Sequence, residues 1–195
     1  MITITSCPPE NAQPYEIGRL VGGTTYPEKF PTLRMNYDET GFNVLFTVYE
    51  KEPYRKRVGH HAPVHLDSCA ELFLNFHPQT SDRYINFEVN ANGAMDASFR
   101  RDRYDTADLK TEEIDGFGIR VSLHDTFWTV QYKIGFDFIK KYYPAFDIAE
   151  KPVMKGNVYK CGEETDPEHY ISFYEVPVTP PDFHTPQFFG DFVIV

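Results

Sequence analysis

Two segments, residues 69–77 and 83–90, carry side chains of the types that recognise sugars. In each segment apolar residues alternate with polar or aromatic ones, which predicts two strands. If the strands are neighbours, the second set shares one face: Glu71, Phe73, Asn75, Tyr84, Asn86 and Glu88. Aromatic rings stack on the apolar face of a pyranose, and carboxyl and amide groups bind its hydroxyls. The pattern therefore favours carbohydrate binding; the alternative is a face that is solvated or covered by a long loop.

Glu71 and Glu88 also permit a second hypothesis, a glycoside-processing enzyme. Carboxyl groups on neighbouring strands can lie about 5 Å apart, which is the separation in retaining glycosidases. Nothing else in the sequence supports turnover, since it has no Gly-x-Ser-x-Gly, phosphate-loop or Gly-x-Gly-x-x-Gly motif. We therefore expect a binding protein and not an enzyme.

A histidine-rich segment, His60-His61-x-x-x-His65-x-Asp67, offers metal ligands. Pro63 breaks the helix that ligands four residues apart would need, so the segment is interpreted as a loop. Aspartates in residues 101–108 would suit calcium, although no EF-hand loop is present. The sequence thus requires no cofactor, allows a structural calcium ion and leaves any metal ligands unknown.

Composition narrows the partners. The chain has 195 residues, with 19 Lys and Arg against 29 Asp and Glu, a formal net charge of −10. Such a surface repels phosphate, so we expect neither nucleic acid nor a membrane as partner. The N-terminus lacks the basic and apolar regions of a signal peptide, so we expect a cytoplasmic protein, or a secreted one if a leader precedes Met1. Cys7, Cys69 and Cys161 are widely spaced, which favours reduced structural thiols.

The elements that would position these residues are mostly strands. Alternation also marks residues 42–50, residues 118–134 form a hairpin with its turn near 124–126, and the Asn-rich turn at 90–93 leads into a further strand. Trp128 shares its face with apolar residues and is predicted to lie in the core. Only residues 136–143 suggest a helix, which Pro144 ends. We predict one domain, residues 1–195, an all-β antiparallel β-sandwich with long loops and one short helix.

Three segments together resemble a known family. They are Asp67–Asn75, Tyr84–Gly93 and a tail that runs from Gly156–Gly162 through His169–Phe173 to the Phe-His-x-Pro-x-x-Phe-Gly sequence of Asp182–Gly190. This ordered set resembles the carbohydrate-binding module family 9-like proteins, within the broader group of DOMON-like β-sandwiches. The similarity covers roughly residues 35 to 195.

The resemblance implies a non-catalytic module that binds the ends of glucans or xylans in a slot of the sandwich, often with structural calcium. Glu71 matches the ligand-contacting glutamate of the family, and Phe173 falls where a slot-lining tryptophan is usual. His65 stands where the second aromatic wall is expected. An arginine that helps bind sugar in the characterised modules aligns near Glu88, so this chain departs from the family at both positions. Neighbouring residues on the sheet and in the tail complete the predicted site. Its candidate residues are His65, Glu71, Asn86, Glu88, Arg100, Phe173 and Tyr174.

Two further alternatives stay open. The replaced aromatics would suit an interaction domain whose sugar slot has decayed. Some members of the wider DOMON group bind haem through Met and His, and Met35, Met95 and Met154 offer such a ligand.

Overall fold

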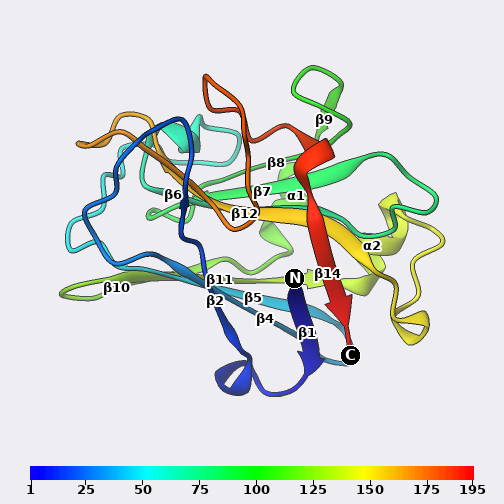
Figure 1. The fold of residues 1–195 in the computed structure, drawn as a ribbon. Coiled ribbons are helices and arrows are strands. Elements are labelled where there is room, and N and C mark those ends of the chain that lie inside the picture. The colour runs from blue at the N-terminus through cyan, green and yellow to red at the C-terminus, as the bar shows by residue number, and fades with distance from the viewer.

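The computed structural model describes residues 1–195, which fold into two β-sheets packed face to face (Figure 1). The β4 sheet, the lower layer in Figure 1, contains β10 (Arg120–Leu123), β11 (Trp128–Gly135), β5 (Gly41–Val48), β4 (Thr32–Tyr37) and β2 (Pro14–Glu16). The β6 sheet, the upper layer, contains β12 (Met154–Gly162), β6 (Cys69–Asn75), β7 (Tyr84–Asn90), β8 (Met95–Arg100), β9 (Thr106–Asp108), β13 (His169–Ser172) and β3 (Arg19–Leu20). Its strand β14 (Gly190–Ile194) pairs with β12 and runs from the upper layer toward the lower one in Figure 1.

The first strand, β1 (Ile2–Ser6), joins the two sheets. Ile2–Ile4 pair with Phe192–Ile194 of β14, and Thr5 and Ser6 pair with Asn36 and Tyr37 of β4. Both pairings are parallel, whereas every other strand pair is antiparallel. The prediction of a β-sandwich is confirmed, and its wholly antiparallel character is wrong at this one strand. A strand of five residues is too short for its sequence pattern to indicate the direction in which it pairs.

The main core lies between the sheets. Alternate residues of β5 and β11 point inward, and Trp128 is fully buried, as predicted. Its indole Nε1 donates a hydrogen bond to Glu50 Oε2 at 2.9 Å, so the buried polar atom is satisfied. The predicted hairpin forms from β10 and β11, where His124 N–H donates to the Phe127 carbonyl.

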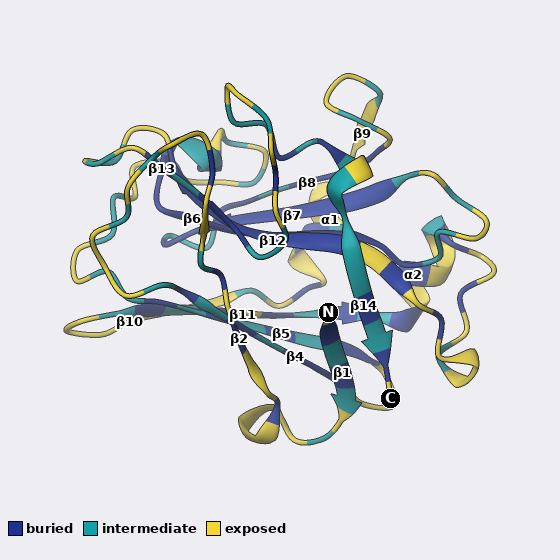
Figure 2. Ribbon diagram, in the orientation of Figure 1, coloured by how far each residue is buried: buried dark blue, intermediate teal, exposed yellow.

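A second apolar layer covers the outer face of the β6 sheet. Every residue of β6 and β7 is buried, which Figure 2 shows as continuous dark strands below exposed loops. Phe73, Tyr84 and Tyr159 point outward from the sheet and pack under Val176 and Phe183 of the long segment 173–189. The long segment therefore covers the part of this face that Phe73, Tyr84 and Tyr159 occupy.

Two α-helices occur where one was predicted. The expected helix is α2 (Phe136–Tyr142), whereas α1 (Thr111–Asp115) was missed because it is barely one turn long. The Lys110 N–H donates to the Glu113 carboxylate at the start of α1, and Ile114 anchors the helix in the core. Neither helix approaches the length and apolar character that crossing a bilayer demands.

Candidate functional site

A cavity of about 310 Å³ lies on the outer face of the β6 sheet, where the covering segments leave the sheet open. Its floor comes from β6, β7, β8 and β12, and its walls from the 3₁₀ helix η2 (Val64–Leu66), β13 and the segment 181–184. The lining residues are His65, Glu71, Phe73, Glu88, Asp96, Arg100, Arg103, Cys161, Glu163, Tyr170, Pro181, Phe183 and His184.

Two carboxyl groups form the floor of the cavity. Glu71 of β6 lies directly opposite Glu88 of β7 in the paired strands. Alternation along each strand turns both side chains to the outer face, where they line the cavity. Asn86 is fully buried beside them and donates from Nδ2 to Glu88 Oε1 at 2.9 Å. The Asn86 carbonyl oxygen in turn accepts from the Ser98 N–H at 3.0 Å. Asn86 therefore fixes Glu88 and does not itself line the cavity.

Burial controls the charge of these groups. Burial and the nearby Asp96 carboxylate raise the pKa of Glu88 to about 7. Burial, Cys161 and Glu88 raise the pKa of Glu71 well above its ordinary value. Burial therefore favours the protonated form of Glu71, which can both donate and accept a hydrogen bond.

Basic groups line the side of the cavity nearest the tail. Arg100 is 7% exposed, its Nη1 lies 3.3 Å from His184 Nδ1, and its Nε has no hydrogen-bond partner. Burial and the charges of Arg100 and Arg103 lower the pKa of His184 to about 3, so the imidazole is neutral. A neutral imidazole lets Nδ1 accept from Tyr84 Oη at 3.0 Å. The guanidinium of Arg100 thus keeps an unused donor beside the cavity.

The walls are aromatic. The Phe73 ring stacks on the His184 imidazole with centroids 5.0 Å apart, and Phe183 stacks on Tyr159 at 4.0 Å. Tyr159 Oη also donates to the Phe183 carbonyl at 3.2 Å, which holds the segment 181–184 against the sheet. The cavity therefore combines aromatic rings with polar donors and acceptors.

The structure brings four of the seven predicted site residues into this cavity: His65, Glu71, Glu88 and Arg100. Asn86 lies below them. Phe173 and Tyr174 lie elsewhere, where Phe173 contacts Tyr15 and Tyr174 edge to face and Tyr174 Oη donates to the Asp191 carbonyl at 2.5 Å. Both pack against the main core, because residues 173–174 follow β13 past the end of the cavity.

Sequence reasoning missed Tyr170, Phe183 and His184 as lining residues. The signal for the last two is the Phe-His-x-Pro sequence of the tail, which carries part of the family resemblance. Their approach to β6 depends on how the long loop folds back, which periodicity does not encode.

The residues suggested as ligands of a metal ion or of haem contact other side chains or lie in the core. His60 contacts Asp115 at 3.1 Å, His61 contacts Asp96 at 3.4 Å, and Asp67 pairs with Arg57, so the histidine-rich segment is dispersed. Met35, Met95 and Met154, suggested as haem ligands, are buried in the main core. In the segment 101–108 the Asp105 carboxylate pairs with Arg83 at 2.6 Å, and Asp102 Oδ1 accepts from two backbone N–H groups.

Comparison with known proteins bears on this cavity. A family model described as "Carbohydrate-binding family 9" matches residues 23–194. The chain belongs to carbohydrate-binding family 9. The resemblance noted from the three sequence segments is thereby confirmed. No curated protein matches the chain in sequence.

Solved structures agree with the family 9 assignment at the level of the fold. A candidate carbohydrate-binding protein from Bacteroides uniformis ATCC 8492 superposes with a TM-score of 0.77 at 20% identity, covering 100% of this chain and 97% of that one. A family 9 module from Caldicellulosiruptor kristjanssonii in complex with glucose gives 0.71 at 13% identity, with 100% and 95% covered. The cellotriose complex of a family 9 module from the same organism gives 0.71 at 13%, with 99% and 92% covered.

Proposed function

We propose that this family 9 chain binds the end of a glucan- or xylan-type carbohydrate, without turnover, in the cavity above β6 and β7. The observation that carries the proposal is the lining itself: hydrogen-bonding groups of Glu71, Glu88 and Arg100 face the same space as the rings of Phe73 and Phe183. A pyranose offers complementary chemistry, an apolar face and a rim of hydroxyls. The glucose and cellotriose complexes of the Caldicellulosiruptor modules support the choice of ligand class.

Hydrolysis is the second candidate function, because a pair of carboxyl groups lies on one floor. A retaining glycosidase needs one protonated acid and one ionised nucleophile. Here burial raises the pKa of both Glu71 and Glu88, which disfavours the ionised nucleophile. Membership of family 9 and the sugar complexes of the Caldicellulosiruptor modules also favour binding over turnover.

Calorimetric titration with cellobiose, xylobiose and their borohydride-reduced forms tests the proposal. Binding of the native sugars and not of the reduced ones would support recognition of the reducing end. Arg100→Lys removes the guanidinium group of a cavity-lining residue and should weaken binding, whereas the control change Phe173→Leu, outside the cavity, should leave it unchanged. No heat from any of the four sugars would reject the glucan or xylan assignment and leave the interaction-domain alternative.

An activated aryl glycoside separates binding from catalysis. We expect no turnover by the wild-type chain. Turnover that disappears in Glu71→Gln while sugar binding persists would instead establish the enzyme.

A further inference from the structure

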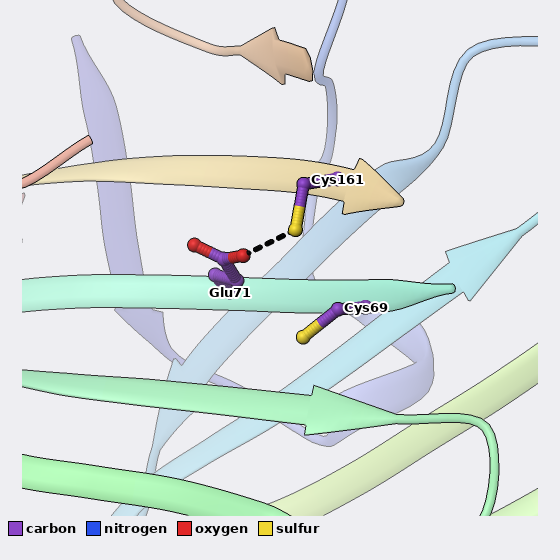
Figure 3. A group of neighbouring side chains, drawn as sticks. All are labelled: Cys69, Glu71 and Cys161. Atoms are coloured by element: carbon purple, nitrogen blue, oxygen red, sulfur yellow. Dashed lines mark hydrogen bonds between the residues drawn. The ribbon is translucent and has the colours of Figure 1, made fainter. Parts of the chain in front are cut away.

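Two cysteines and a glutamate meet at the inner wall of the cavity. Cys69 and Glu71 lie two residues apart on β6, so they share its outer face, and Cys161 of β12 is directly opposite Cys69. Their ligand atoms all lie within 4.8 Å of one another, and Cys161 Sγ donates to Glu71 Oε1 at 2.7 Å (Figure 3). All three side chains are buried.

The cluster has one open side. Glu71 and Cys161 line the cavity and Cys69 does not, so the cluster borders the cavity on the side of Glu71 and Cys161. The third cysteine, Cys7, lies on β4's side of the molecule, where its Sγ contacts Thr5 Oγ1. The chain thus concentrates both of its fully buried thiols at one carboxyl group.

We propose that Cys69, Glu71 and Cys161 bind a divalent cation of the zinc type, with the fourth coordination position facing the cavity. Thiolates select borderline and soft metals over calcium or magnesium, and three protein ligands with an open position are typical of accessible zinc sites. The observations behind this site do not depend on the proposed carbohydrate function, although both sites would use Glu71.

The geometry needs only small movements. Zinc–sulfur bonds of about 2.3 Å and zinc–oxygen bonds of about 2.0 Å place tetrahedral ligands roughly 3.5–3.8 Å apart. The present separations fall within 4.8 Å, and the contact between Cys161 Sγ and Glu71 Oε1 would lengthen from 2.7 Å as the metal replaces the shared proton. The two strands that carry the ligands are adjacent and paired along their length, so the site is rigid apart from side-chain rotation.

Proton exchange is the chemical signature of such a site. The Cys161 thiol donates its proton to Glu71 Oε1, so it carries a proton in the metal-free protein. Thiolate and not thiol is the form that binds zinc, so metal binding must displace the thiol protons to solvent. Two thiolates, a carboxylate and a divalent cation leave a net charge of −1, and affinity should increase with pH.

A redox pair is the competing interpretation, since Cys69 and Cys161 are cross-strand partners. Oxidation by a small disulfide would join their sulfurs, release two thiol protons and transfer two electrons to the oxidant, which would leave as two thiols. A disulfide would not involve the carboxyl group, whereas the hydrogen bond between Cys161 Sγ and Glu71 Oε1 places that carboxyl beside the sulfur. The metal site accounts for all three residues.

Titration with zinc and cobalt tests the proposal on chelator-treated protein kept reduced by a phosphine. We expect one equivalent of zinc in calorimetry, with a heat that depends on the ionisation enthalpy of the buffer because protons are released. Cobalt should give a near-ultraviolet thiolate charge-transfer band and the visible bands of a tetrahedral complex. Glu71→Gln should weaken zinc binding by more than the roughly 10–100-fold that loss of an outer-sphere partner costs.

Control variants make the result specific. Cys161→Ser and Cys69→Ala should abolish the cobalt band, and Cys7→Ser should leave it unchanged; far-ultraviolet circular dichroism verifies that each variant is folded. Zinc binding that survives in Cys161→Ser, or no binding by reduced wild-type protein, would overturn the proposal. An intramolecular disulfide after treatment with oxidised glutathione, in protein that binds no zinc when reduced, would assign the pair to redox chemistry instead.

Discussion

The Lys160→Met change tests a buried ion pair directly behind the cavity. Lys160 of β12 points between the sheets and is fully buried, and its Nζ lies 3.0 Å from Glu50 Oε1. The ammonium also donates to the Cys161 carbonyl at 2.7 Å and contacts His169 Nε2 at 2.7 Å. Methionine keeps the volume of the lysine stem and removes the charge, so the substitution isolates the electrostatic contribution.

The expected loss is set by what remains around Glu50. Burial opposes ionisation of this carboxyl, but the Lys160 charge and hydrogen bonds from Ser68 and Trp128 outweigh it and hold the pKa below its ordinary value. Removing one partner of a buried pair costs about 3–5 kcal/mol. Because Ser68 and Trp128 still donate to the carboxylate, and its side chain is 12% exposed, we expect a loss near 3 kcal/mol.

Urea unfolding at pH 7, followed by the fluorescence of the single tryptophan, measures the loss. The double variant Glu50→Gln/Lys160→Met removes both charges. Its loss of stability should be smaller than the sum of the two single losses by at least about 1 kcal/mol, as expected for groups in contact. A loss below about 1 kcal/mol for Lys160→Met, or strictly additive losses in the double variant, would refute an energetically coupled pair.

Three further predictions follow from described contacts. Burial and the charge of Lys160 lower the pKa of His169 from 6.5 to about 4. As the pH falls, the unfolded chain is therefore protonated at this residue before the folded one. The resulting stabilisation of the folded state, up to about 3 kcal/mol, should be fully present above pH 6.5 and lost as the pH falls to about 4. Urea midpoints at pH 7 and 4.5 should differ less in His169→Gln, and an unchanged pH dependence would contradict this. Phe173→Ala should lower the free energy of unfolding by about 2 kcal/mol, less than for a fully buried ring, and leave sugar affinity unchanged; weaker sugar binding at unchanged stability would place Phe173 in the site after all. Calcium added to metal-free protein should not raise Tm, because Asp102 and Asp105 already have protein partners, and a clear rise by differential scanning fluorimetry would reveal a structural site.

The strands could be predicted because apolar side chains recur at every second residue along them. In β5 and β11 the inward side chains are apolar and several outward ones are polar, so alternation gives both the strand and its face. The pairing of Glu71 with Glu88 also follows, since consecutive strands joined by a short connection are usually neighbours. These regularities gave Glu71, Phe73 and Glu88 as residues of one face, whereas His65 came from the family resemblance.

The remaining features depend on contacts between distant parts of the chain. Phe183 reaches the cavity because it stacks on Tyr159, 24 residues earlier, and no local pattern encodes that approach. Phe173 was placed by resemblance alone, at a position where the chain turns toward Tyr15. The direction of β1 is likewise a property of its partners β4 and β14, not of its own five residues.

The arrangement of β1 also determines how the molecule would respond to force. Because β1 and β14 are parallel neighbours, tension applied between Met1 and Val195 would slide one strand along the other. All the hydrogen bonds between Ile2–Ile4 and Phe192–Ile194 would then carry the load together, whereas an antiparallel pair pulled from one end opens bond by bond. The pairing of Thr5 and Ser6 with β4 extends this shear contact to the other sheet. The strand that closes the sandwich is thus a mechanical clamp, and both sheets would resist extension until it gives way.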